Sequence, residues 1–373
     1  MFIELHMIQN FAPSNLNRDD TNNPKDCEFG GVRRARISSQ CLKRAIRTSP
    51  AFAETTRVEV GTRTKWLVNL LRQRLVAAGK PADQATAILT AFVPEYASKL
   101  DEKSKEEQKT AVLLYLGQAE IGRLVEALLQ NWDSLPQDAP RLAKALVKEQ
   151  KGQTSAPDIA LFGRMLAEQP ELGLEAACQV AHAISTHRVT MEMDFYTAVD
   201  DLNPEDTAGA GMMGFTGFDS ACFYRYARID WEQLVTNLKG DTALARRAVE
   251  GFLRASIAAV PSGKQSNFAA NNPPSFLLGV VRKDGMGWSL ANAFEQPIHP
   301  HGDEGLVAPS VAALDAYWGR LCQVYGDGAL IRTAALSLDA DLPLEALQAA
   351  QVENVETWIG ALVRALPARE VPA

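Results

Sequence analysis

The feature that most constrains the fold is a change in hydrophobic periodicity along the chain. Residues 2–11 (FIELHMIQNF) form a strand-like run, whereas residues 64–189 repeat apolar side chains mainly at helical spacing. In TKWLVNLLRQRLVAAG one predicted helix face carries Leu67, Leu70, Leu71 and Leu75. Pro81 stands near the start of a further predicted helix, and KTAVLLYLGQAEIGRLVEALLQNW reads as a long amphipathic run. This pattern predicts a large helical insertion in a core that contains a sheet.

Strand-like stretches return after the helical region, at SACFYRYARIDW and SFLLGVVR, with a predicted helix ARRAVEGFLRASIAAV between them. This order favours an α+β core with insertions over regularly alternating parallel units. The chain has 373 residues, and single hydrophobic cores stop growing at roughly 250 to 300 residues. We therefore expect one elaborated domain or two.

A second informative stretch is GGVRRARISSQCLKRAIRTS, residues 30–49, which carries six basic residues and no acid in a chain of net charge -7. Ser38 or Ser39 can cap a helix there, because a serine hydroxyl accepts hydrogen bonds from the free amides of a first turn. At 100° per residue, one stripe of this helix carries Gln40, Lys43, Arg44 and Arg47, with Leu42, Ala45 and Ile46 opposite. If the preceding segment is extended, Arg34 and Arg36 share a face.

Most charged stripes are solvated helix faces, and that is the simplest alternative here. A solvated face usually interleaves acids for pairing one turn apart, yet none occurs from Phe29 to Ala53. The overall acidity does not oppose local binding of a polyanion, since charges beyond about 10 Å are screened at ~0.1 M salt. The stretch therefore favours a track for a phosphate backbone.

An ordered set of motifs resembles the CasC family, the RNA-binding backbone subunit of type I-E CRISPR Cascade complexes. The N-terminal motifs are NLNRDD, KD, FGG, RRARISSQ and LKRA. The later ones are AHAISTHRV, DFYTAVDDL, FYRYARI, PSGKQSNFAA and SLANAFE. The resemblance extends to about residue 300 and is thinner in the C-terminal helices.

The resemblance implies a fold with a modified RRM-like (ferredoxin-like) palm, a helical finger insertion and a thumb β-hairpin. The expected domains are palm residues 1–56, finger residues 57–185, thumb residues 186–224 and further palm residues 225–373. Matched by position, the implied RNA contacts are Arg18, Lys25, Ser38, Gln40, Lys43, Arg44, Arg47, Met165, Phe195 and Tyr196, with Lys264 and Gln265 as weaker candidates. Arg34 and Arg36 join the predicted contacts because an extended segment would place them on one face. Many family members place another base directly after the glycine pair, where this chain has Val32, so no phosphate contact is expected at that position.

The implied function is that of a cytoplasmic, non-catalytic scaffold without cofactor or metal. Copies would stack head to tail along a CRISPR RNA and display its spacer for pairing with target DNA in antiviral defence. The other implied partners are the large, small, guide-end-capping and guide-processing subunits of Cascade. Base pairing would then carry the sequence specificity, because phosphate contacts position a nucleic acid without reading it.

The segment GAGMMG, residues 209–214, fits GxGxxG but is not expected to bind a dinucleotide. That fingerprint needs a strand before it and a helix after it, whereas this segment follows polar residues and leads into a strand-like run. A long hairpin tip is the better interpretation, and the resemblance makes it the thumb. Without the resemblance, Phe195, Tyr196 and Met165 would be read as core side chains.

A metal-dependent ribonuclease is the second functional hypothesis, because clustered carboxylates can hold Mg²⁺, and Asp19, Asp20 and Asp26 share one predicted loop. Against it, loop aspartates commonly cap turns. A third alternative is a protein-interaction module that never contacts RNA.

The histidines do not predict a metal site. Cys178, His182 and His187 lie in one predicted helical stretch, and His299 and His301 form a short loop pair. Neither set supplies the second ligand pair that zinc needs, so a structural role is expected for all of them.

No membrane segment and no disulfide framework are expected. No run reaches about 18 apolar residues, and MFIELHMIQNF lacks the basic flank of a signal peptide. The five cysteines form no CxxC pair, which favours reduced thiols in the cytoplasm.

Overall fold

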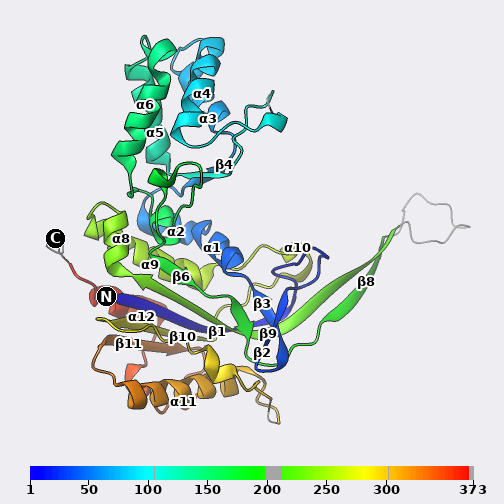
Figure 1. The fold of residues 1–373 in the computed structure, drawn as a ribbon. Coiled ribbons are helices and arrows are strands. Elements are labelled where there is room, and N and C mark those ends of the chain that lie inside the picture. The colour runs from blue at the N-terminus through cyan, green and yellow to red at the C-terminus, as the bar shows by residue number, and fades with distance from the viewer. Residues whose placement is uncertain (105, 199–211, 301, 369–373) are drawn as a thin grey trace, which may run out of the picture. The chain divides into compact units, whose positions relative to one another are not determined.

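The computed structural model describes residues 1–104, 106–198, 212–300 and 302–368 (Figure 1). The chain forms two compact units, each assembled from separate stretches. The sheet unit comprises Met1–Ser49, Val180–Arg228 and Leu253–Leu366. The helical unit comprises Pro50–Gln179, Ile229–Phe252 and the C-terminal residues from Pro367. The sheet unit therefore includes the first strand, the basic stretch and the residues of the predicted hairpin.

An extended, largely antiparallel sheet forms the centre of the sheet unit, with strand order β11-β10-β1-β9-β7-β3-β2. In chain order these strands are β1 (Phe2–Ser14), β2 (Asp26–Phe29), β3 (Val32–Ile37), β7 (Ala183–Ser185), β9 (Met212–Asp230), β10 (Phe276–Arg282) and β11 (Leu330–Ser337). Two further strands, β6 (Cys178–Val180) and β8 (Glu192–Ala198), pair with β9. The mixed α+β fold predicted from the sequence is confirmed.

Helices cover both faces of the sheet around β10. Leu278 and Val280 pack with α11 (Val307–Tyr325), whereas Gly279 faces Trp358 and Leu362. Those two residues belong to α12 (Val355–Arg364), and the Trp358 indole Nε1 donates to the Ala334 carbonyl over 2.9 Å. Strand β10 is therefore buried on both faces, which explains its continuous apolar sequence.

A buried ion pair joins the first strand to β10. The Arg282 guanidinium donates to Glu4 over 3.1 Å, and the exposed fractions of the two side chains are 3% and 0%. The same Glu4 carboxylate accepts from the Trp288 amide at 2.8 Å and from the Tyr226 hydroxyl at 3.1 Å. Arg282 also stacks on the Trp288 ring, 4.0 Å from its centroid. Each partner thus compensates the desolvation of the other.

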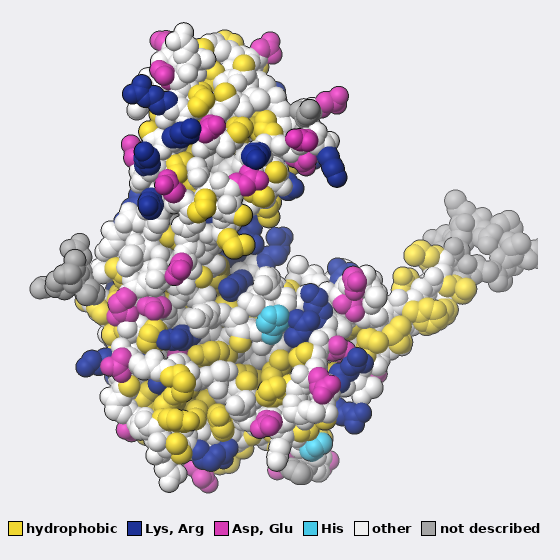
Figure 2. Space-filling view, in the orientation of Figure 1, with side chains coloured by type: hydrophobic (Ala, Val, Ile, Leu, Met, Phe, Trp, Pro, Cys, Tyr) yellow, Lys and Arg dark blue, Asp and Glu magenta, His cyan; other side chains and the backbone are white. Residues whose placement is uncertain are grey.

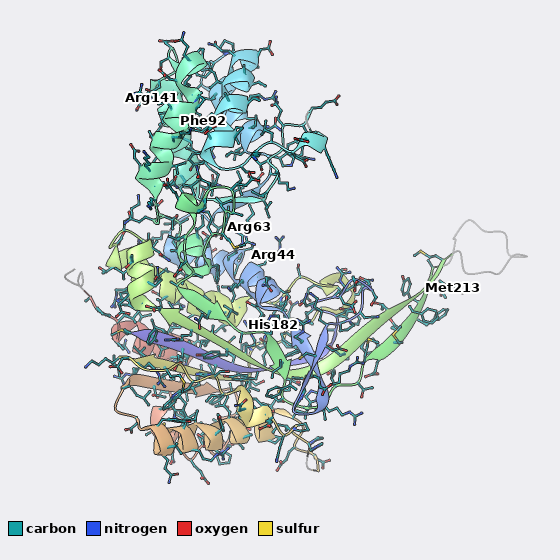
Figure 3. All side chains as sticks on the ribbon, viewed as in Figure 1. Arg44, Arg63, Phe92, Arg141, His182 and Met213 are labelled. Atoms are coloured by element: carbon teal, nitrogen blue, oxygen red, sulfur yellow. The ribbon has the colours of Figure 1, made fainter. Side chains whose placement is uncertain are left out.

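The helical unit has a core of its own. It contains α2 (Pro50–Thr56), α3 (Leu67–Ala77), α4 (Ala82–Tyr96), α5 (Gln118–Gln130), α6 (Leu135–Gln150), α7 (Pro157–Phe162), α8 (Trp231–Asn237), most of α9 (Thr242–Ala258) and the strand pair β4 (Thr62–Thr64) and β5 (Leu114–Leu116). Leu67, Leu71 and Leu75 are buried as predicted, and they join the same cluster as Phe92 (Figure 3). None of the described helices is long and apolar enough to cross a membrane.

The helical insertion is shorter than its periodicity predicted. Its last α-helix ends at Phe162, and residues 163–189 form one short 3-10 helix, turns and short strands. The run KTAVLLYL was expected to be helical, but Leu114–Leu116 forms β5, because these residues pair with β4 and are buried. Cys178, His182 and His187 likewise lie on or beside short strands, so the helix assigned to them was wrong.

The Glu4–Arg282 pair gives a stability prediction. Glu4→Gln should lower the free energy of unfolding by about 3 to 5 kcal/mol, because the Arg282 charge stays buried without its counter-ion. Urea denaturation followed by circular dichroism measures the change. Glu353→Gln is the control, since Glu353 is exposed. Equal midpoints for the two variants would contradict the assignment.

Candidate nucleic-acid interface

The basic stretch forms a short strand followed by a capped helix. Helix α1 spans Ser39–Arg47, and the Ser38 hydroxyl accepts from the Cys41 amide over 3.3 Å, which confirms the predicted cap. Leu42 packs into the core formed by β1, β3, β7 and β9. Gln40 and Arg44 are both exposed, and Figure 3 labels Arg44 on the helix. The helix thus buries its apolar side and presents a polar one.

Only part of the predicted basic stripe is accessible. Lys43 is half-buried, and Arg47 is buried with 6% of its surface exposed. Arg47 follows the buried Ile46 in the last turn, where a cation is favoured by the free carbonyls of the helix end. Counting Arg47 as part of an exposed stripe was therefore wrong, and the accessible positions are Gln40, Lys43 and Arg44.

Arg34 is a structural residue in this chain. Its side chain is 0% exposed, and its guanidinium donates to the carbonyls of Phe29 at 3.1 Å, Ser185 at 3.2 Å and Phe294 at 2.7 Å. A fourth bond of 3.2 Å reaches the Glu295 carbonyl. The expectation that Arg34 contacts RNA does not fit this environment, because its side chain is buried and makes four hydrogen bonds inside the protein.

The polar loop before β2 is fixed by asparagines. The Asn17 side chain accepts from the Ser38 amide at 2.8 Å, and the Asn17 carbonyl accepts from the Lys25 amide at 2.9 Å. Asn15 donates to the Gly217 carbonyl at 2.8 Å, and the exposed Arg18 donates to the Asn22 side chain at 2.7 Å. These bonds bring the loop to the start of α1. Asn17 was not among the contacts predicted from the sequence, although it lies within the NLNRDD motif.

Lys25, Arg36 and Arg44 converge on the surface beside this loop. Burial raises the pKa of the Cys41 thiol, while the charges of Lys25 and Arg44 lower it, so both cations lie close to Cys41. Arg36 bonds His182 over 3.0 Å. Partial burial, followed by Arg36 and Lys25, lowers the pKa of His182, which favours the neutral ring as an acceptor. His182 was expected to be structural, and it belongs to this cationic surface.

The loop aspartates have local partners. Asp19 accepts from the Thr21 hydroxyl and from the amides of Thr21 and Asn23, and the Thr21 hydroxyl is the main reason for its lowered pKa. Asp26 forms an ion pair with Arg33 at 2.9 Å. In the part of the chain that the structure describes, which excludes His301, no group of three or more His, Cys, Asp or Glu side chains could hold a metal ion.

The PSGKQ turn lies against the same loop. Gly263 approaches the Leu16 carbonyl closely, and Lys264 follows with a left-handed φ of 51° and a half-buried side chain. The side-chain amide of Gln265 donates to the Pro261 carbonyl at 3.0 Å and so stabilises the turn. Lys264 therefore stays a candidate contact, whereas Gln265 mainly holds the local backbone.

Strands β8 and β9 form the predicted hairpin, paired from Glu192↔Phe218 to Ala198↔Met212. Its expected tip, including Gly209, falls outside the described residues. Figure 2 shows a nearly continuous apolar band along the described part. The exposed side chains, with Met213 labelled in Figure 3, are Met193, Phe195, Tyr196, Met212, Met213 and Phe215.

Phe195 and Tyr196 are exposed by 52% and 42%, so the alternative that they are core residues is wrong. As neighbours in a strand they point to opposite faces of the hairpin. Phe195 packs on Phe215 at a centroid distance of 5.2 Å. Tyr196 instead lies over Gly214, where an added Cβ would be 2.4 Å from its ring. One flat surface can therefore contact only one of these two rings.

Met165 is the remaining predicted contact, and it belongs to the helical unit. Its side chain is 92% exposed, which excludes a core role. Neighbouring Arg164 is anchored internally, by an ion pair with Glu120 at 2.9 Å and by a bond to the Tyr115 carbonyl at 3.1 Å. Met165 is thus presented on a fixed backbone.

A surface for single-stranded nucleic acid needs two components. One is a set of cations, present here beside a capped helix, and the other is a set of exposed aromatic and methionine side chains. Cations follow the backbone, and flat apolar side chains stack on bases of any sequence. The sheet unit carries both components.

Comparisons with known proteins agree with this geometry. A family model described as CT1975-like protein matches residues 3–365. A solved chain from a "CRISPR RNA-guided surveillance complex, pre-nicking" is 34% identical with a TM-score of 0.88, covering 98% of this chain and 100% of that chain. A second, from a "CRISPR RNA-guided surveillance complex", is 29% identical with a TM-score of 0.77 and the same coverage. No curated protein sequence matches the chain significantly.

A buried carboxyl lies at the base of the hairpin. Asp219 on β9 is 8% exposed and has no hydrogen-bond or ion-pair partner among the described residues. Burial, and then the nearby carboxylate of Asp26, raise the pKa of Asp219 to about 7. Because this pKa lies above that of the unfolded chain, protonated Asp219 favours folding below about pH 4, and the benefit is lost as the pH rises through about 7.

Asp219→Asn should therefore stabilise the protein at pH 8 and have little effect at pH 4.5. The gain at pH 8 is at most about 4 kcal/mol, since each tenfold change in a protonation equilibrium corresponds to about 1.4 kcal/mol. Thermal melts at both pH values measure it. Asp194→Asn, at an exposed position of the same hairpin, is the control. The same shift at both pH values would argue against a raised pKa.

Proposed function

The chain belongs to the CT1975-like protein family, and from this premise we propose that it is the RNA-binding backbone subunit of a CRISPR surveillance complex of the Cascade type. The observation that carries the proposal is the acid-free basic helix, with accessible Gln40, Lys43 and Arg44, beside a loop that supplies Arg18 and Lys25. The family and the two surveillance-complex chains support the same role.

In this proposal the guide backbone runs past the start of α1. Lys25, Arg36, Lys43 and Arg44 supply positive charge, and the free amides after the Ser38 cap can donate to phosphate oxygens. Neutral His182 holds Arg36 at one edge of this surface. None of these groups reads a base, so binding is indifferent to spacer sequence and falls with added salt.

The hairpin would interrupt the guide at intervals. One aromatic ring of its tip-proximal part stacks on a base, and stacking of this kind contributes about 1 to 3 kcal/mol for any base. The other face of the hairpin is then free for a neighbouring subunit. Head-to-tail copies would extend along the RNA, because a heterologous contact that does not close into a ring continues until its template ends.

We extend the proposal to a type I-E complex that displays the spacer for pairing with target DNA, in contact with the other Cascade subunits. The chain itself would not cut nucleic acid. Asp19 supports this reading, since its carboxylate closes a turn.

The first test is the scattering mass of complexes formed on single-stranded RNAs of increasing length. The mass should rise in protomer steps while the RNA stays intact on a denaturing gel. A constant mass with shortened RNA would replace the scaffold by a ribonuclease. Absence of any RNA-bound species would favour a protein-interaction module.

The second test removes the accessible cations of α1. Lys43→Ala with Arg44→Ala should weaken RNA binding and reduce the slope of log K against log salt by up to about 1.4, since each single-strand phosphate contact contributes roughly 0.7. Fluorescence anisotropy over a salt series provides both quantities. Arg320→Ala with Arg332→Ala, on α11 and β11, is the matched control. An unchanged slope in the α1 variant would exclude this helix from the track.

A further inference from the structure

A pocket of about 440 Å³ lies within the sheet unit, at the root of the hairpin. Its lining comes from the turn between β2 and β3 and from the segment that enters β8, namely Gly31, Val32, Arg33, Arg188, Val189, Thr190 and Met191. The volume falls in the range of small-ligand sites, roughly 300 to 1,000 Å³. None of the contacts predicted from the sequence belongs to this lining.

The backbone of the pocket is fixed. The Val189 amide donates to the Arg33 carbonyl over 3.0 Å and joins the two walls. The turn is held at Gly30, whose φ is +61° and where an added Cβ would be 1.8 Å from the Glu295 carbonyl oxygen. Only glycine is accommodated at this position. The neighbouring Gly31 has no atom near its virtual Cβ, so its backbone is open to the pocket.

The charge of the lining is uniformly positive. Arg33 and Arg188 come from opposite walls, and none of the lining residues is acidic. Asp26 pairs with the Nε side of Arg33 at 2.9 Å and orients that guanidinium. Arg188 is exposed and has no partner for its guanidinium among the described residues. Two guanidiniums around one cavity are suited to a phosphate, which accepts paired hydrogen bonds from each.

We propose that this pocket binds one phosphate and its ribose from the single-stranded guide RNA, with Arg188 as the principal cation. Thr190 supplies a hydroxyl for the sugar–phosphate backbone, and Val32 and Met191 supply apolar contact for the ribose. Val32 leaves the turn itself without a charge, and Arg188 provides one from the facing wall. The inference rests on the proposed RNA-binding function and adds a site that it does not require.

Arg188→Gln tests the site while keeping a polar side chain of similar length. Anisotropy titration of a single-stranded RNA should show affinity lowered about 3- to 10-fold at low salt and a salt slope reduced by about 0.7. Arg332→Gln, an exposed arginine on β11, should change neither quantity. Val32→Lys should act in the opposite sense, with tighter binding and a steeper slope. Thermal melts of every variant verify folding.

The outcomes separate the two proposals. If the unmodified protein binds RNA and Arg188→Gln leaves affinity and slope unchanged, the pocket is not a phosphate site, whereas the proposed function stands. If the unmodified protein binds no RNA, the proposed function fails first. A third outcome is that Arg188→Gln leaves binding intact on an RNA that accommodates one copy, but abolishes the stepwise increase in mass on longer RNAs. The pocket would then hold a carboxylate of a neighbouring copy, which overturns the inference.

Discussion

The arrangement of the interface depends on one buried cation. The Arg34 guanidinium is fully buried, where an unpaired charge would be strongly unfavourable, so it needs hydrogen-bond acceptors inside the protein. It finds them on carbonyls at the end of β2, the end of β7 and the 3-10 turn Ala291–Phe294 with the following residue. These segments are separated by more than a hundred residues in sequence. Arg34 thereby fixes the β2–β3 turn, which carries Arg33 on one side and leads to α1 on the other.

Much of the fold follows from local chemistry and was predictable. The strand-like apolar runs of β1 and β10, the cap at Ser38 and the apolar face of α3 depend on neighbouring residues, and each is present. The errors arose where tertiary pairing overrides local preference. Leu114–Leu116 has helix-forming neighbours, but it pairs with β4 in the structure. The stretch around His182 is short and bonded to β9 and β3, and no periodicity within it could have shown this.

The candidate site was predictable in outline and not in detail. The absence of acids around α1 identified the basic surface, because that property depends only on which residues are adjacent in the sequence. The solvent exposure of each arginine depends instead on the tertiary fold. Arg34 and Arg47 have the same composition signal as Arg44, yet two of the three are buried. Arg188 was not predicted, because it is an isolated arginine in the sequence. It becomes a candidate contact only when the fold places it opposite Arg33 across the pocket.

The single strand β9 continues from the hairpin into the centre of the sheet, and its burial changes along the way. From Ala221 to Ile229 its residues are mostly buried and paired, whereas Met212, Met213 and Phe215 are exposed and paired only with β8. Its outer end can therefore exchange amide hydrogens and open locally without unfolding the sheet. The inner part of β9 cannot open without disrupting the sheet. One continuous strand thus joins a rigid segment in the sheet to a flexible outer segment in the hairpin, so the hairpin can adjust to a partner while the strand keeps its register in the sheet.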